Sequence, residues 1–226
     1  GVSAAVIAGD LALFNSYRLM ERSGVAAAMR DRLLEVLDEA MFASAAGELI
    51  DVDFSIDPHT PVVEDILQME RLKTAVYSFE APLQAGAILA GASEQIVATL
   101  GDFGREIGIA YQIVDDVLGV FGEESFTGKT TIGDLREGKR TVLIAFACAT
   151  PQWEELRHLI GKHDLTEAEA QTARAMLEEC GARTFADDLV RGCAQRALDL
   201  LAEPHMPEAL RAELHPVAAT VLERMR

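Results

Sequence analysis

The stretch over residues 111–119, YQIVDDVLG, decides how this chain folds. Apolar residues recur at steps of three and four across residues 93–118, which predicts one long helix with Ser93 as its N-cap. Two adjacent carboxylates, Asp115 and Asp116, interrupt the apolar run. Unpaired acids are costly to bury, so a helix keeps them most readily where a cation or a charged ligand neutralises them. The stretch therefore predicts a buried helix that presents acids to a ligand.

Gln112 lies three residues before Asp115 and four before Asp116, so we expect the three side chains to project from neighbouring positions on one face. Magnesium is a hard cation that takes one or two carboxylates, several waters and phosphate oxygens, and adjacent aspartates on a rigid helix suit it. An Asp-Asp pair also fits a helix cap or an ion pair with a neighbouring helix. The acids alone leave both interpretations open.

A glycine-rich loop with lysines follows over residues 122–138. Lys129 lies in it and Lys139 comes directly after it. A lysine acts as a mobile point charge on phosphate, and glycines let a loop fold tightly over a ligand. In isolation a solvated surface segment is the better interpretation of such a loop, but after the acidic pair the loop favours a magnesium–diphosphate site.

Two earlier segments carry further candidates. Lys73 and Thr74 are predicted at the start of a helix, where a lysine, a hydroxyl and free backbone N–H groups make an anion site. An ordinary helix start with a surface lysine is the alternative. Asp51 falls in an expected extended break over residues 51–58, where a turn residue and a ligand-binding acid are equally good interpretations.

Composition points to an all-α protein. The 226 residues are half hydrophobic and 6% aromatic, and alternation typical of strands is nearly absent. Further helices are expected over about 2–22, 24–47, 62–90 with a bend near Lys73 or Pro82, and 141–149, and four more after residue 153. We expect one domain over residues 1–226, because no long linker interrupts it. The first helix is apolar on most faces, which predicts burial in a core or in a subunit interface.

The net charge of −17 argues against a nucleic-acid partner, because phosphate backbones bind basic surfaces. It also means that a polyphosphate would bind well only where metal ions invert the local sign. Three scattered cysteines indicate neither a zinc site nor a disulfide framework, and a reducing, cytoplasmic setting fits best. No segment is long and apolar enough to span a bilayer.

Taken in order, several short motifs resemble the trans-prenyl diphosphate synthases, most closely the bacterial geranylgeranyl type. No single motif is decisive, but their order and spacing run over most of the chain. The matching motifs are Ala8-Gly9-Asp10, Gly47-Glu48-x-x-Asp51, Lys73-Thr74-Ala75, Gly86-Ala87, Tyr111-Gln112-x-x-Asp115-Asp116, Gly128-Lys129, Asp134-Leu135 and Glu137-Gly138-Lys139-x-Thr141.

The resemblance implies an all-α bundle with a central cavity, in which Mg²⁺ draws the diphosphate from an allylic substrate. Isopentenyl diphosphate then attacks the resulting cation, and the product is a longer all-trans prenyl diphosphate. The family forms homodimers, and the first two helices here match those that pack across its interface. The implied roles are metal ligands at Asp115 and Asp116, diphosphate binding by Lys73, Thr74, Gln112, Lys129 and Lys139, a metal–water shell at Asp51 and Asp134, and a cavity lined by Tyr111, Glu48 and Tyr77.

Three departures from the family pattern qualify this implication. The N-terminal helices that carry the family's first aspartate-rich motif and its isopentenyl diphosphate site are not in this sequence, so we expect the chain by itself not to complete the reaction. Gly119 stands where the second motif has its third acid, and Glu48 stands where glutamine is common. Product length is not encoded here, because the residues that set it precede the first motif.

Two rival functions remain open at this point. A non-catalytic partner subunit of a heteromeric synthase would keep the fold and the dimer face but lack the first motif, and the sequence upstream of Gly1 discriminates it. A terpene cyclase on the same helical scaffold is the second rival. The Lys73-Thr74 and Gly138-Lys139 motifs speak against the cyclase.

Overall fold

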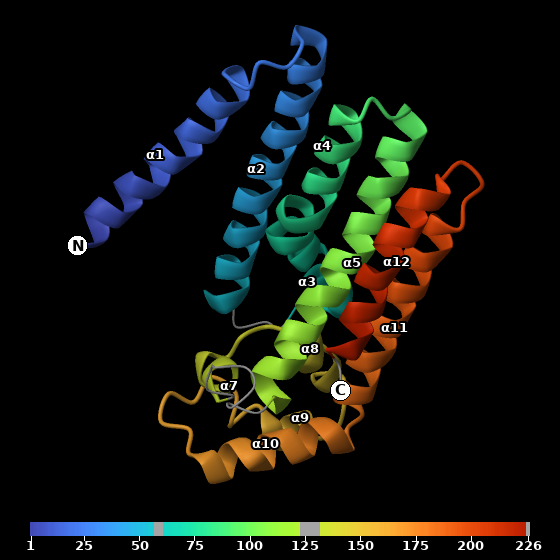
Figure 1. The fold of residues 1–226 in the computed structure, drawn as a ribbon. Coiled ribbons are helices and arrows are strands. Elements are labelled where there is room, and N and C mark those ends of the chain that lie inside the picture. The colour runs from blue at the N-terminus through green and yellow to red at the C-terminus, as the bar shows by residue number, and fades with distance from the viewer. Residues whose placement is uncertain (57–60, 123–131, 225–226) are drawn as a thin grey trace.

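A computed structural model describes residues 1–56, 61–122 and 132–224, and within them every regular element is helical. This confirms the all-α prediction (Figure 1). The helices are α1 (Val2–Glu21), α2 (Ala27–Ile56), α3 (Val63–Glu70), the π-helix η1 (Arg71–Glu80), α4 (Ala81–Leu89), α5 (Glu94–Phe121), α7 (Gly133–Glu137), α8 (Val142–Ala147), α9 (Trp153–Leu156), α10 (Glu167–Glu179), α11 (Ala182–Leu201) and α12 (Glu208–Glu223).

The long helix α5 is the axis of the bundle. It packs against η1 and α4 on one side and against α11 and α12 on the other, while α10 crosses the end where α5 finishes (Figure 1). Its start is fixed as predicted, because the Ser93 side chain accepts a hydrogen bond from the backbone N–H of Ile96. Phe103, Ile107 and Ile113 are fully buried along its length. The apolar periodicity of the sequence therefore places α5, and the acids it carries, in the core.

The helical run from α3 through η1 to α4 is continuous, and its middle ten residues are wound as a π-helix. Two glycines of α5 let this segment approach closely. A Cβ at Gly104 would lie 2.8 Å from the Glu80 backbone nitrogen, and one at Gly108 would lie 2.6 Å from the Ala75 Cα. Only glycine permits backbones this close. These two glycines thus allow η1 to pack directly onto α5.

Two sequence predictions about local structure are wrong. The extended break expected from residue 51 does not begin there, because α2 continues to Ile56; residues 57–60 lie outside the described part. Asp51 pairs with Lys73 of η1, and this contact holds α2 against η1 despite the weak helix propensity of the neighbouring residues. Within the expected loop at residues 122–138, the short helix α7 forms and ends at Gly138, which has the left-handed φ of +69°.

Helix α1 leaves its apolar side chains uncovered within this chain. It contacts α2 but contains no buried residue, and Val6, Leu11 and Phe14 are 59%, 64% and 71% exposed. Burial of this helix in the core of the described chain is therefore wrong, and its burial in a subunit interface stays a prediction. Among the described helices, none has the length and apolarity to cross a membrane.

Candidate active site

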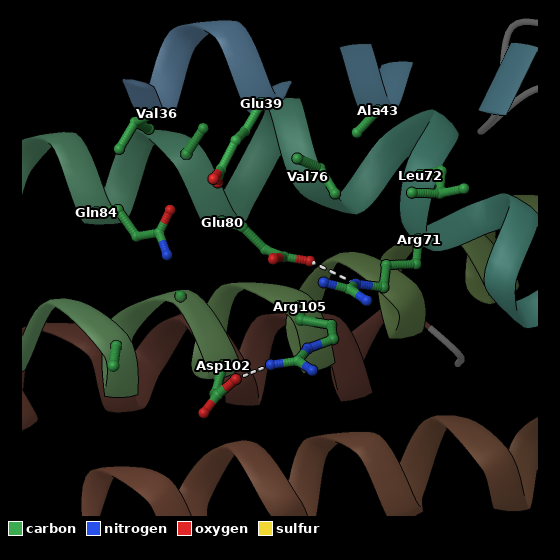
Figure 2. Close-up of a pocket in the computed structure, with 13 residues that line it drawn as sticks. Val36, Glu39, Ala43, Arg71, Leu72, Val76, Glu80, Gln84, Asp102 and Arg105 are labelled. Carbon is green, nitrogen blue, oxygen red and sulfur yellow. Dashed lines mark hydrogen bonds and ion pairs between the residues drawn. The ribbon is translucent and has the colours of Figure 1, made fainter. Parts of the chain in front are cut away.

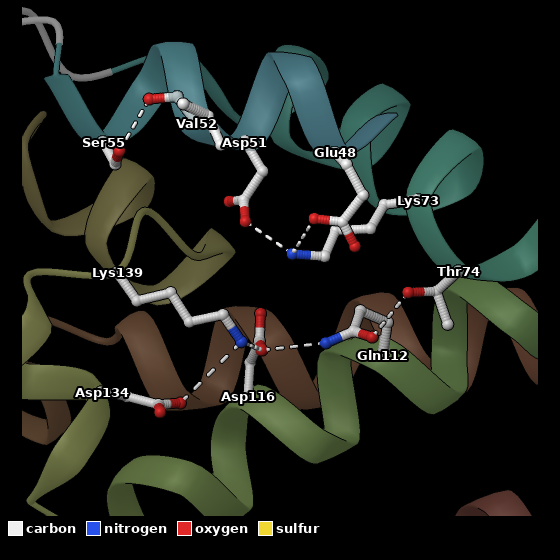
Figure 3. Close-up of polar contacts among 10 residues, drawn as sticks. All are labelled: Glu48, Asp51, Val52, Ser55, Lys73, Thr74, Gln112, Asp116, Asp134 and Lys139. Carbon is white, nitrogen blue, oxygen red and sulfur yellow. Dashed lines mark hydrogen bonds and ion pairs between the residues drawn. The ribbon is translucent and has the colours of Figure 1, made fainter. Parts of the chain in front are cut away.

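Asp116 lies at the centre of a hydrogen-bonded group that joins η1, α5 and the segment between α7 and α8 (Figure 3). Its side chain is only 2% exposed, and its Oδ1 accepts hydrogen bonds from Lys139 Nζ at 2.6 Å and from Gln112 Nε2 at 3.1 Å. Gln112 Oε1 accepts a further hydrogen bond from Thr74 Oγ1 of η1 at 2.9 Å. We call Thr74, Gln112, Asp116 and Lys139 the Asp116 chain. Its buried acid has both a cation and an amide donor, which offsets much of the cost of burying it.

Lys139 is shared between two carboxylates. Asp134 Oδ2 of α7 lies 3.9 Å from its Nζ, beyond the shorter contact with Asp116. Burial alone would lower the pKa of Lys139, but attraction to Asp116, and then to Asp134 and Asp115, raises it well above its ordinary value. Lys139 therefore stays charged throughout the physiological range and holds the acids of α5 and α7 together.

Glu70 at the end of α3 is a second buried acid beside the Asp116 chain. It is 2% exposed, and neither carboxyl oxygen has a hydrogen bond of ordinary geometry among the described residues. Burial, followed by repulsion from Asp116, raises the pKa of Glu70 well above its usual range. Burial also raises the pKa of Asp116, although Lys139 and Gln112 oppose that rise. Lys139 therefore favours the ionised form of Asp116, whereas burial favours the neutral form of Glu70.

Asp115 points in a different direction from its neighbour. Its carboxylate is 41% exposed and lies 4.0 Å from Arg224 at the end of α12. Arg224 also covers the ring of Tyr111, with its guanidinium carbon 4.3 Å from the ring centroid. Adjacent residues on a helix are about 100° apart, so Asp115 faces α12 while Asp116 faces the interior. The structure therefore brings Gln112 and Asp116 together and leaves Asp115 at the edge of the group.

Lys73 forms a second group of ion pairs with α2 (Figure 3). Its Nζ lies 2.5 Å from Asp51 Oδ2 and 3.3 Å from Glu48 Oε2. Burial would lower the pKa of Lys73, but hydrogen bonding and attraction to Asp51 and Glu48 raise it overall. Close packing makes the contact possible, because a Cβ at Gly47 would lie 2.6 Å from the Lys73 Cα.

The predicted helix start at Lys73 and Thr74 is wrong. Both residues lie inside the continuous helical run of α3, η1 and α4, where backbone N–H groups are used within the helix. Any anion binding here therefore depends on the side chains alone. The lysine and the hydroxyl point toward α2 and α5, respectively, as their hydrogen bonds show.

The remaining predicted site residues have different positions. Tyr111 is half-buried and packs against Phe79 with the ring centroids 5.5 Å apart. Tyr77 is 52% exposed. Lys129 falls in residues 123–131, outside the described part of the chain.

A cavity of about 400 Å³ lies between α2, η1, α4 and α5 (Figure 2). Its polar wall includes Arg71, which donates a hydrogen bond to Glu80 at 3.2 Å, and the ion pair of Arg105 with Asp102. None of the Asp116 chain lines this space. The Asp116 chain and Asp134 thus lie outside this cavity, where η1, α5 and the α7 region meet.

The donor set fits magnesium. Asp116 and Asp134 offer hard carboxylate oxygens around one lysine, and Mg²⁺ needs only one or two carboxylates beside waters and phosphate oxygens. Within the described residues, no three Asp, Glu, His or Cys side chains are gathered closely enough to hold a metal by themselves. A Mg²⁺ ion at these carboxylates would need further oxygen ligands, such as waters or phosphate oxygens.

Comparison with known proteins identifies the family. A model described as polyprenyl synthetase matches residues 1–177, and the chain belongs to this family. It is 33% identical over 213 residues to the geranylfarnesyl diphosphate synthase of Aeropyrum pernix, covering 93% of this chain and 66% of that protein. It is 32% identical over 231 residues to a short chain isoprenyl diphosphate synthase of Methanothermobacter thermautotrophicus, covering 99% of this chain and 68% of that protein.

Solved structures agree with this assignment. A geranylgeranyl pyrophosphate synthase of Corynebacterium glutamicum, complexed with isoprenyl diphosphate and magnesium, matches with a TM-score of 0.90 and 32% identity. The match covers 99% of this chain and 64% of that protein. One from Pyrococcus horikoshii matches with a TM-score of 0.89 and 28% identity. The chain thus spans about two thirds of the length of these relatives, and it has the all-α isoprenoid synthase fold.

Sequence reasoning did not identify Glu70 or Arg224 as neighbours of the candidate site. A signal for Glu70 was available, because Ile66, Met69 and Glu70 follow the helical spacing of one buried face. The argument that singled out Asp116, an acid on an apolar face, applies equally to Glu70. No comparable signal exists for Arg224, whose position depends on how α12 folds back onto α5.

Proposed function

We propose that the protein is a trans-prenyltransferase that condenses an allylic diphosphate with isopentenyl diphosphate to a longer all-trans prenyl diphosphate, of geranylgeranyl type. The observation that carries the proposal is the Asp116 chain: a buried carboxylate of α5 joined to a lysine between α7 and α8, to an amide of α5 and through it to a hydroxyl of η1. Carboxylates are ligands that Mg²⁺ prefers and lysine is a point charge suited to phosphate, which supports this role in a chain of the polyprenyl synthetase family. The activity is proposed for the whole protein, because this chain spans about two thirds of the length of the relatives it matches.

Asp115 and Asp116 would hold Mg²⁺, with Asp51 and Asp134 binding waters in its shell. When bound, the metal supplies Lewis-acid assistance to departure of the diphosphate. It also reverses the local sign of a chain whose net charge is −17, so that a diphosphate is attracted. The position of Asp134 beside Lys139 supports a shell that extends from α5 to α7.

Lys73, Thr74, Gln112, Lys129 and Lys139 would bind the allylic diphosphate. In the structure, Lys73 is paired with Asp51 and Lys139 with Asp116. A bound diphosphate would replace these carboxylates, so that each ammonium group would stay paired with an anion.

In the proposed reaction, the allylic C–O bond breaks and its electron pair leaves with the diphosphate. The double bond of isopentenyl diphosphate then forms the new C–C bond to the allylic carbon. A proton is lost to restore a double bond. The protein's part is to hold both diphosphates and to exclude water from the cation.

We further propose a homodimer that forms through α1 and α2. The exposed apolar side chains of α1, together with Phe42 and Leu49 of α2, make a surface that favours burial against a second copy.

The thiols of Cys180 and Cys193 suit a reducing cytoplasm.

Product formation tests the proposal. The intact protein is incubated with an allylic diphosphate, labelled isopentenyl diphosphate and Mg²⁺, and prenyl products are separated by chain length. A longer linear prenyl diphosphate is expected with Mg²⁺ and none with excess chelator. The proposal is contradicted if the assay yields no prenyl diphosphate longer than the allylic substrate, or if it yields a cyclic hydrocarbon instead.

A further inference from the structure

Gly119 lies three positions after Asp116 on α5, next to it on the helix surface. A Cβ at Gly119 would lie 3.0 Å from the Asp134 Cγ and closer still to its Oδ2. Asp134 of α7 therefore occupies the space that a side chain at position 119 would need. The same Oδ2 atom faces Lys139 Nζ at 3.9 Å, on the lysine that also binds Asp116 (Figure 3).

We propose that Gly119 is a positioning residue for the diphosphate site, an inference that rests on the function proposed above. Because Gly119 has no side chain, it leaves the space in which the Asp134 carboxylate of α7 lies beside the Asp116–Lys139 pair. The second carboxylate on this side of the site is thus supplied by a neighbouring helix, where α5 itself has only a glycine.

Folding alone does not favour glycine at this position. Gly119 is inside α5 with no left-handed φ, and alanine in a helix interior is more stable than glycine by about 1 kcal/mol. The atoms that a new Cβ would displace are the end of one flexible side chain, so the helices need not move. Gly119→Ala therefore separates the two effects: the fold is kept, while Asp134 is pushed away from Lys139.

The experiment measures binding of inorganic pyrophosphate to the intact protein by calorimetry at several Mg²⁺ concentrations. Gly119→Ala, Asp134→Asn and the double variant are compared with the wild type, with thermal unfolding as the folding control. We expect Gly119→Ala to weaken Mg²⁺-dependent binding about tenfold, within the range for residues that orient metal ligands. In the Asp134→Asn background the same substitution should change affinity less than about twofold, because the group it displaces is already altered.

Gly101→Ala is the matched control. It lies on the same helix, and its Cβ would also meet a flexible polar side chain, with Gln84 Cδ at 3.0 Å. It should leave pyrophosphate binding unchanged.

Unchanged binding in Gly119→Ala, or an equal loss in the Asp134→Asn background, overturns the inference while leaving the proposed function standing. A wild type that binds no pyrophosphate with Mg²⁺ overturns both.

Discussion

Two lysines, Lys139 and Lys73, are each held by a carboxylate at nearly the same distance, 2.6 Å to Asp116 and 2.5 Å to Asp51. Their surroundings differ. Asp116 is 2% exposed, whereas Asp51 is 24% exposed and the second partner of Lys73, Glu48, is 58% exposed. Ion pairs near solvent contribute little to stability, whereas breaking a buried pair leaves an uncompensated charge. Equal distances therefore conceal unequal contributions: the Lys139 pair contributes more to the folded framework, and Lys73 is the cation more readily exchanged onto a ligand.

The largest effect is expected from the buried partner. Asp116→Asn leaves Lys139 without its main counter-charge, and we expect it to lower the free energy of unfolding by about 3–5 kcal/mol. The matched substitution Asp51→Asn should cost about 0–1 kcal/mol. Urea unfolding without metal or substrate measures both. Equal losses would remove the distinction between the two lysines.

The next effect concerns Glu70, whose folded-state pKa is raised by burial and then by Asp116. A carboxyl group with a raised pKa stabilises the fold below its unfolded pKa, near 4.5, and that stabilisation is lost as the pH rises toward the folded value. Glu70→Gln has no proton to lose. It should therefore become more stable than the wild type as the pH rises from 5 to 8, by at most about 1.4 kcal/mol for each pH unit.

Urea unfolding in metal-free buffer at several pH values checks this, with Glu64→Gln, exposed on the same helix, as the control. The control should follow the wild type at every pH. A wild type that gains stability relative to Glu70→Gln as the pH rises would show that Glu70 is held ionised.

The smallest change in stability is expected at Lys73. Lys73→Gln should alter the free energy of unfolding by less than about 1 kcal/mol, because its partners reach solvent. Allylic diphosphate binding should weaken about tenfold, equivalent to about 1.4 kcal/mol. Lys162→Gln, which removes another lysine paired with an acid, serves as control and should leave binding unchanged. A stability loss as large as that of Asp116→Asn would assign Lys73 to the framework.

The sequence predicted the elements whose apolar spacing is regular. Helix α5 and its cap at Ser93 were predicted correctly, because each depends on residues close together in the chain. The end of α2 was not, because contacts with η1 sustain the helix past Asp51. The π-helical winding of η1 was also missed, since it accompanies close packing on the glycines of α5, which no local pattern reports.

For the candidate site, the sequence supplied residue types and helix faces, and the fold supplied the partners. Gln112 and Asp116 were correctly expected on one face, since four residues separate them. That Lys139 pairs with Asp116, and that Asp115 turns toward α12, depends on how distant helices cross. Metal and substrate roles of these residues remain predictions.

The central claim is that the acids and lysines around Asp116 and Lys73 form a diphosphate site only when divalent cations are present. The most direct measurement is calorimetric titration of the intact protein with inorganic pyrophosphate, with Mg²⁺ and with excess chelator. Saturable binding with Mg²⁺, and its loss with chelator, is the predicted result. Binding of equal strength without the metal, or no binding with it, would contradict the account.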